Sequence, residues 1–260
     1  MSNRRFDIHA ETCIFTQLKY CTLEISQHQK IAWILGAGEL VGRKCLLQLL
    51  QHSAYKQVVA LMEEPLRFEH HRLAIHEVSY ERLPDTLPEG PVHDVFYCWD
   101  GTSRPIKGER DNFDPAGTYA AILAREARDR KANQFMYLSS VGADTSSTLY
   151  YRQEKRMVEK YLEELDFWAV HLFRPALITD ENASAPEWAR RSADWLGRSL
   201  STLTGGVLGK YRPVDGLTVA KAMVQAAQGF KPGVQVYSSE YLQELAKSLD
   251  KGLIRRDGKR

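Results

Sequence analysis

Short apolar runs and longer amphipathic segments alternate along most of this chain. From residue 31 onward, runs rich in β-branched and aromatic residues are each followed by a segment in which apolar residues recur at helical spacing. The expected strands are 31–35, 56–62, 73–79, 93–99, 134–140 and 167–175. Strands that alternate with helices form βαβ units, so the pattern predicts an α/β fold, a doubly wound parallel sheet with helices on both faces.

Three helices are predicted between these strands. The first, 40–50, follows the first strand directly. Asp114 and Pro115 provide a cap and a first-turn proline for a second helix through 116–132. The third is the amphipathic segment 149–165, which follows the fifth strand. Each helix is long enough to cover one face of the sheet.

The two ends of the chain interrupt the alternation. Residues 1–30 form an N-terminal extension with weak strand-like alternation, compatible with an edge strand, an ordered arm or an over-extended start. One domain, 31–250, is expected to follow, with a basic C-terminal tail at 251–260. Within it, 176–212 is a variable region expected to cover a substrate cleft, because ligands bind beyond the carboxyl ends of the strands.

Composition narrows the classes of partner. The net charge is +2 with both signs scattered, so no nucleic-acid surface is expected. No apolar run reaches the roughly 18 residues of a membrane span, and the N-terminus lacks an export signal, so a cytoplasmic protein is predicted. Histidines and cysteines show no metal spacing, which predicts reduced thiols and no metal. A small-molecule substrate is the expected partner, and a homo-oligomer is possible but unsupported.

A glycine cluster follows the first predicted strand in "IAWILGAGELVGRKCLLQLL". Its three glycines can provide a tight turn, close backbone approach and helix-to-strand packing, and the free amides at the helix start favour a pyrophosphate. This is the arrangement of a Rossmann-like dinucleotide turn. The expected cofactor contacts here are Gly36, Gly38, Glu39, Leu40, Val41 and Gly42.

Glu39 makes this turn ambiguous. A carboxylate beside a helix N-terminus can satisfy the same amides and interacts favourably with the dipole by about 0.3 to 1 kcal/mol. It would then compete with pyrophosphate. Nucleotide binding and a self-capped helix start without a ligand are therefore both open.

Residues after the second and fourth strands bear on the cofactor. Glu63 lies about 20 residues beyond the glycines, where an acid can accept the hydroxyls of an adenosine ribose, so NAD is favoured over NADP. Arg67 nearby could instead meet a 2′-phosphate, and a solvated turn is the alternative for Glu63. Asp100 and Gly101 are placed to pass beside a ribose, or to form a simple turn.

The strongest chemical signal is a serine, a tyrosine and a lysine in "YLSSVGADTSSTLYYRQEK". Tyr151 and Lys155 share a helical face, and a lysine ammonium near a phenol lowers the phenol pKa from about 10 towards neutrality. Tyr151 can then donate or accept a proton at a carbonyl or alcohol. Ser140, or Ser139 beside it, ends the preceding strand and can orient the reacting oxygen.

Together with "LFRPALI" and "RPVDGLTVAKAMVQAA", these motifs resemble the atypical short-chain dehydrogenases/reductases, and within them the HIV Tat-interactive protein 2 family with its bacterial relatives. The resemblance spans about residues 31–245. It implies an NAD(P)-binding fold in which Ser140, Tyr151 and Lys155 are catalytic and Lys155 also holds the nicotinamide ribose.

The residues that depart from the family pattern all lie at or next to positions expected to contact the cofactor. Gly38 replaces the usual threonine or serine, Glu39 replaces the middle glycine, and Arg156 follows the lysine where glycine is common. Glu63 stands where many relatives carry arginines suited to NADP. Two functions follow: an NAD(P)-dependent oxidoreductase acting on a small carbonyl or alcohol, or a non-catalytic dinucleotide-sensing regulatory or scaffold protein.

Overall fold

A computed structural model describes residues 29–64, 68–99, 118–140, 150–180 and 212–257 of the chain. Its centre is a seven-stranded parallel sheet in the order β3-β2-β1-β4-β5-β6-β9. The strands are β1 Lys30–Leu35, β2 Tyr55–Met62, β3 Leu73–Glu77, β4 Asp94–Tyr97, β5 Gln134–Leu138, β6 Ala169–Arg174 and β9 Gly233–Ser238. The order reverses between β1 and β4, which is the switch point of a doubly wound sheet.

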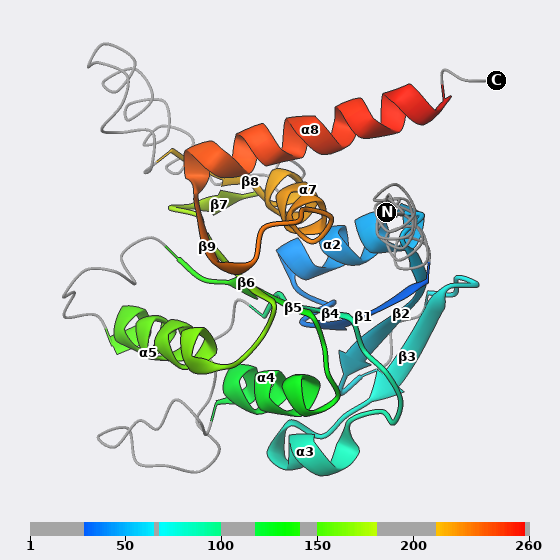
Figure 1. The fold of residues 1–260 in the computed structure, drawn as a ribbon, viewed down its shortest axis with the longest axis vertical. Helices are drawn as coiled ribbons and strands as arrows, with labels where there is room; N and C mark the ends of the chain where they lie inside the picture. Colours follow the sequence, from blue (N-terminus) through cyan, green and yellow to red (C-terminus); the bar gives the residue numbers. More distant parts are fainter. Residues whose placement is uncertain (1–28, 65–67, 100–117, 141–149, 181–211, 258–260) are drawn as a thin grey trace, which may run out of the picture.

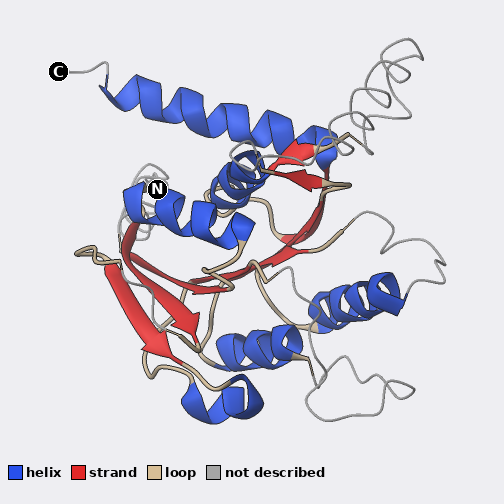
Figure 2. Ribbon diagram, turned by 180° about the vertical axis from the view of Figure 1, so that it is seen from behind, coloured by secondary structure: helices blue, strands red, loops and turns tan. Residues whose placement is uncertain are grey.

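Helices cover both faces of the sheet (Figures 1 and 2). One layer contains α2 Leu40–Gln51, α7 Gly216–Ala226 and α8 Ser239–Asp257, and the other contains α3 Leu83–Thr86, α4 Tyr119–Asp129 and α5 Tyr150–Glu164. A 3-10 turn, η1 Tyr80–Arg82, precedes α3, and a separate parallel pair joins β7 Ile178–Thr179 to β8 Val214–Asp215. The predicted α/β fold with helices on both faces is confirmed.

Side-chain alternation along the strands explains the two layers. In β1, Ala32 and Ile34 face α2 and α7, whereas Trp33 and Leu35 face the layer of α3, α4 and α5, and all four are buried. The same alternation continues through β2, β4, β5 and β6, which gives one apolar cluster on each face. Burial of both faces is why these strands appear in the sequence as continuous apolar runs.

Cys45 on α2 and Cys98 beyond β4 are free thiols that lie together in the first of these clusters. Burial, with a smaller contribution from Cys98, raises the pKa of the Cys45 thiol. A buried thiol of raised pKa is a poor nucleophile, so Cys45 acts as a packing residue.

Three elements differ from the sequence prediction. Helix α4 begins at Tyr119, and its cap is Thr118, whose Oγ1 accepts a hydrogen bond of 3.2 Å from the amide of Ala121. The cap predicted at Asp114 lies outside the described residues. Strand β9 was missed because it is an edge strand with several exposed positions, so its apolar pattern is weak. Helix α8 continues to Asp257, so the segment expected as a basic tail begins as a helix.

A buried polar network joins the amino ends of the central strands. The carboxylate of Asp94 accepts hydrogen bonds from Lys30 at 3.0 Å, Tyr55 at 2.7 Å and the side-chain amide of Gln134 at 3.2 Å. Gln134 in turn accepts from Nε2 of His171 at 3.0 Å. These bonds satisfy a carboxylate that is completely buried, as a buried charge requires.

The protonation of His171 follows from its partners. Because Nε2 donates to Gln134, Nδ1 is left to accept the hydroxyl of Tyr237 at 2.9 Å, and this arrangement needs a neutral ring. Burial lowers the pKa of His171 to about 4, and positive charge on Lys30 and Lys231 adds to the effect. The folded protein therefore holds a neutral imidazole well below the pH at which a free histidine becomes charged.

We expect the free energy of unfolding to fall as the pH is lowered from 6.5 to 4.5. In that window the unfolded chain protonates His171, with a pKa near 6.5, while the folded chain does not, so acid favours unfolding by up to about 2 to 3 kcal/mol. Urea unfolding at a series of pH values measures the effect. The His171→Gln variant is the control, and an unchanged pH dependence in that variant would show that other groups are responsible.

Candidate functional site

The carboxyl edge of the sheet gathers most of the sequence-predicted site. Because the strands are parallel, the glycine turn after β1, Glu63 after β2, Trp99 after β4 and the serine pair after β5 all emerge at this edge. It is the edge at which ligands bind in doubly wound folds. The sheet thus brings together segments that are up to about 100 residues apart in the chain.

Two glycines of the turn are required by the protein's own backbone. Gly36 has a φ of +86°, and a Cβ there would lie 2.6 Å from the amide nitrogen of Trp99. A Cβ on Gly42 would overlap the carbonyl oxygen of Gly36. The roles predicted for these two positions, a tight turn and close packing of helix on strand, are therefore apparent in the geometry.

Gly38 differs from both. A Cβ there would have the Met62 methyl as its nearest neighbour, at 3.8 Å, and the residue is exposed. No described protein group requires a glycine at this position, which leaves open space beside the turn. A ligand that approaches Gly38 would therefore find open space.

Glu39 is the N-cap of helix α2, but its side chain makes no capping hydrogen bond. Helix geometry leaves the amides of Leu40, Val41 and Gly42 without intrahelical acceptors. The self-capped helix start considered from the sequence is thus not what is observed. Open amides at the helix N-terminus, with open space over Gly38, fit the pyrophosphate of a dinucleotide.

The serine pair lies at the end of β5. The Oγ atoms of Ser139 and Ser140 are both buried, and within the described part of the chain neither has a hydrogen-bond partner. The amide of Ser139 is fixed by the carbonyl of Phe173 at 2.7 Å, so the pair is held by the sheet rather than by its hydroxyls. Two unsatisfied buried hydroxyls are costly unless a ligand completes them.

Lys155 projects from α5 to the same strand end. Its side chain is buried, its Nζ donates to the carbonyl of Leu138 at 3.1 Å, and it lies 6.0 Å from the centre of the Tyr137 ring. Leu138 immediately precedes the serines, so the predicted lysine and serines do come together. Tyr151 lies on α5, one helical turn before Lys155, and its side chain is outside the described residues, as are Asp100 and Gly101.

An ion pair that sequence reasoning missed fixes α5 against β6. The Arg174 guanidinium donates to both oxygens of Glu159, at 3.0 and 2.8 Å, and the Glu159 side chain is only 2% exposed. Glu159 is four residues after Lys155, so the pair anchors the helical face that carries the lysine. The sequence signal that could have indicated this ion pair is Glu159, four residues after Lys155, together with Arg174 at the end of the sixth strand.

Three aromatic rings form a second unpredicted cluster at this edge. Trp99 and Tyr119 stack with centroids 5.2 Å apart, and Tyr80 lies 4.8 Å from Trp99 and 5.3 Å from Tyr119. The amide of Tyr80 donates to Oε1 of Glu63 at 3.3 Å. Glu63, predicted to accept a ribose, therefore sits beside an apolar platform and close to the glycine turn.

The region expected to cover a substrate cleft begins and ends beside helix α2. Lys44 forms ion pairs with Asp180 at 3.1 Å and Asp215 at 3.4 Å; Asp180 directly follows β7, and Asp215 is the last residue of β8. Asp215 also caps α7 through the amides of Leu217 and Thr218. The segment between these strands, 181–211, lies outside the described residues.

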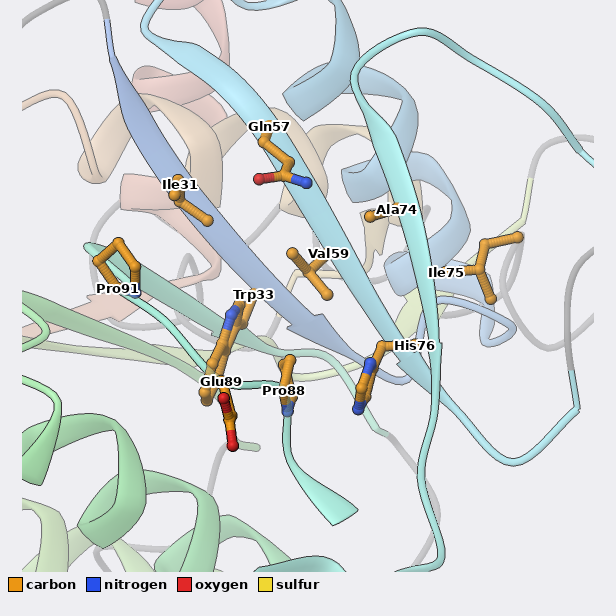
Figure 3. Close-up of a pocket in the computed structure, with 10 residues that line it drawn as sticks. All are labelled: Ile31, Trp33, Gln57, Val59, Ala74, Ile75, His76, Pro88, Glu89 and Pro91. Atoms are coloured by element: carbon orange, nitrogen blue, oxygen red, sulfur yellow. The ribbon is translucent and has the colours of Figure 1, made fainter.

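A pocket of about 200 Å³ lies elsewhere, along the β1–β2–β3 face that is turned towards α3 (Figure 3). Apolar side chains such as Ile31, Trp33 and Val59 form its floor, and Gln57, His76 and Glu89 are polar groups in its lining. The His76 ring is already bonded to the carbonyl of Thr86 at 2.9 Å. This lining offers no pair of nucleophile and base, so the carboxyl edge remains the candidate site.

The fold and this edge together define the NAD(P)-binding fold of the short-chain dehydrogenases/reductases. The chain superimposes on the oxidoreductase ylbE from Lactococcus lactis with a TM-score of 0.55 over 85% of this chain and 97% of that chain, at 14% identity. It superimposes equally well on the ADP-L-glycero-D-manno-heptose-6-epimerase of Helicobacter pylori, with a TM-score of 0.55 over 88% and 84% of the two chains, at 15% identity. Both similarities establish the fold.

Sequence relatives establish the family. Protein HTATIP2 of Rattus norvegicus is 32% identical over 205 residues, covering 77% of this chain and 82% of the relative. Protein FMP52-1 of Scheffersomyces stipitis is 29% identical over 238 residues, covering 84% and 99%. The chain belongs to the atypical short-chain dehydrogenase/reductase family that includes HTATIP2 and FMP52, as the sequence motifs predicted. No family model matches the sequence.

The expected cytoplasmic location is contradicted by these relatives. FMP52-1 of Scheffersomyces stipitis is named a mitochondrial protein, as are the FMP52 proteins of Debaryomyces hansenii and Candida albicans. The expectation depended on the lack of a hydrophobic export signal, a feature that does not distinguish the cytosol from an organelle. In the described part of the chain, no helix has both the length and the hydropathy needed to cross a bilayer.

Proposed function

We propose that this chain is an NAD(P)-dependent oxidoreductase that moves a hydride between nicotinamide and a small carbonyl or alcohol substrate. The observation that carries the proposal is the pair of buried, unsatisfied hydroxyls of Ser139 and Ser140 next to buried Lys155, at the ligand-binding edge of the sheet. Buried polar groups without partners mark a place where a ligand supplies them. The family of the chain supports the same reading.

Each residue of the site then has a chemical task. Ser140, with Ser139 as its neighbour and substitute, donates a hydrogen bond to the reacting oxygen and orients it. Tyr151 gives a proton to a carbonyl or takes one from an alcohol, and Lys155, one helical turn away, lowers the pKa of that phenol. Lys155 also holds the nicotinamide ribose. A bound nicotinamide supplies or accepts the hydride.

The cofactor is proposed to be NAD rather than NADP. Glu63 is exposed beside the glycine turn, where its carboxylate can accept the two hydroxyls of an adenosine ribose. A 2′-phosphate at the same place would meet a like charge. The open amides at the start of α2 would hold the pyrophosphate, and Asp100 and Gly101 are expected beside a ribose.

Calorimetric titration of the purified protein with NADH and with NADPH tests this proposal. We expect micromolar binding of NADH, followed by its oxidation in the presence of at least one member of a panel of small aldehydes, ketones and quinones. Binding without oxidation of any panel member would favour the alternative function, a non-catalytic dinucleotide-sensing regulatory or scaffold protein. No binding of either dinucleotide would reject both functions.

A further inference from the structure

Strand β9 leaves one end of the seven-stranded sheet open. It pairs with β6, and no other described strand lies along its outer side (Figure 1). Its sequence, GVQVYS, contains no charged residue and no proline. Natural edge strands usually carry such residues, because an unprotected edge pairs with other chains. The opposite edge strand, β3, ends with the charged Glu77. The β9 edge therefore has the character of a strand that is covered by a partner.

Two valines of β9 are exposed on the face of the sheet that carries α4 and α5. Their register partners in β6, Val170 and Leu172, are buried in the apolar cluster that includes residues of α5. One strand further out, Val234 is 40% exposed and Val236 is 48% exposed. Trp168, which directly precedes β6, is 43% exposed. Apolar side chains exposed together in this way mark a surface that binds another protein.

The backbone groups of the same two valines also point away from the sheet. The amide of Gly233 donates to the carbonyl of Trp168 at 2.8 Å, so Gly233 directs its hydrogen-bonding groups towards β6. Because this direction alternates along a strand, Gln235 also bonds towards β6, whereas the N–H and C=O groups of Val234 and Val236 point outward. These outward groups are the donors and acceptors that a further strand would use.

We propose that β9 is an interface between two copies of this chain, which pair their β9 strands antiparallel about a two-fold axis centred on Gln235. In this register Val234 of each copy lies opposite Val236 of the other, so each pair exchanges two backbone hydrogen bonds and brings two apolar side chains together. The two sheets then form one continuous sheet, and the same surface is used by both copies. This interface is independent of the proposed function.

Charges at the two ends of β9 favour the antiparallel arrangement. Lys231 lies two residues before the strand and Glu240 two residues after it. Both are exposed, and neither forms an ion pair with another described residue. Antiparallel pairing brings Lys231 of one copy to the strand end that carries Glu240 of the other, and the two-fold axis repeats this contact. The strand is thus complementary to itself in charge as well as in hydrogen bonding.

Sedimentation velocity of the purified chain between about 1 and 200 µM tests the interface. We expect a reversible equilibrium of monomer and dimer, which Val236→Lys should weaken at least about 30-fold because it places a charge in an apolar contact. Leu47→Lys is the matched control, since Leu47 on α2 is 43% exposed and its replacement should change the dissociation constant less than about twofold. A chain that remains monomeric over this range, or that is weakened equally by both variants, would overturn the inference.

A cross-link tests the register. Gln235 would face itself across the axis in a pair without backbone hydrogen bonds, where the two Cα atoms are about 4.5 Å apart, so Gln235→Cys should form a disulfide between copies under mild oxidation. In Ser238→Cys the two thiols would be about 20 Å apart along the strands and should not cross-link. Electrophoresis without reductant measures both, with the unaltered chain as the background for its four cysteines. Equal cross-linking of the two variants, or a dimer in which Gln235→Cys does not cross-link, would contradict the proposed pairing.

Reversing the charges at the strand ends tests the orientation. At about 0.05 M NaCl, where exposed charges are little screened, Lys231→Glu and Glu240→Lys should each weaken association about fivefold. The double variant restores opposite charges and should return to within about twofold of the unaltered chain. Additive weakening in the double variant, or no effect of either single change, would reject the antiparallel arrangement.

Discussion

Replacing Gly42 by alanine is expected to abolish dinucleotide binding and to lower the free energy of unfolding by about 3 kcal/mol. The added methyl group would overlap the carbonyl oxygen of Gly36, and that atom belongs to a backbone that cannot rotate away. Helix α2 would have to move off β1, which displaces the amides of Leu40 and Val41 from the ligand edge. Urea unfolding and calorimetric titration with NADH measure the two effects.

Gly38→Ala is the matched control for this prediction. The new methyl would meet only the Met62 methyl, at 3.8 Å, so the stability of the protein should change by less than about 0.5 kcal/mol. Any loss of NADH affinity in Gly38→Ala would then come from the ligand that approaches there. Equal destabilisation of the two variants would contradict the packing described for the turn.

Replacing Tyr151 by phenylalanine is expected to lower the rate of NADH oxidation by about 1,000-fold. Phenylalanine removes the hydroxyl that exchanges a proton with the substrate and keeps the ring and the helix. Because the contacts proposed for the dinucleotide are the glycine turn and Lys155, the affinity for NADH should remain within about threefold of the unaltered protein. Stopped-flow absorbance at the NADH band, with the most active compound of the panel, measures the rate.

Tyr150→Phe is the neighbouring control, since Tyr150 is adjacent to Tyr151 but does not have the four-residue spacing from Lys155. This variant should keep nearly full turnover. If Tyr150→Phe loses activity and Tyr151→Phe does not, the assignment of the proton donor is wrong. If both retain activity, the proton comes from another group, and the tyrosine–lysine mechanism is rejected.

The three glycines of the turn look equivalent in the sequence but have different surroundings in the structure. From the spacing alone, each of the three glycines was given a role in the turn, and Glu39 left nucleotide binding and a self-capped helix start both open. The fold distinguishes them, because Gly36 and Gly42 meet neighbouring backbone while Gly38 faces open space. It also shows that Glu39, at the start of α2, is exposed and makes no capping hydrogen bond. These are consequences of which strand ends are adjacent.

Local patterns in the sequence were sufficient for the strands β1 to β6, for the helices α2 and α5 and for placing Lys155 at the strand end that carries Ser140. Buried parallel strands appear in the sequence as continuous apolar runs. The position of a lysine along a helix fixes the face of the helix on which its side chain lies. A serine that ends a parallel strand lies at the carboxyl edge of the sheet, where ligands bind. The weak edge strand β9 and the start of α4 were misjudged, since exposure removes the apolar pattern and several residues can serve as a cap.

The sequence by itself thus determined the class of fold and supplied the residues proposed for proton transfer, because both depend on periodicity and short-range spacing. Only the tertiary structure decided the ion pair of Glu159 with Arg174, the aromatic cluster around Trp99, the network around Asp94 and the hydrogen bond from the Tyr80 amide to Glu63. Each of these joins residues from different elements. Their proximity is set by the strand order and by the way the helices pack, which no local pattern in the sequence specifies.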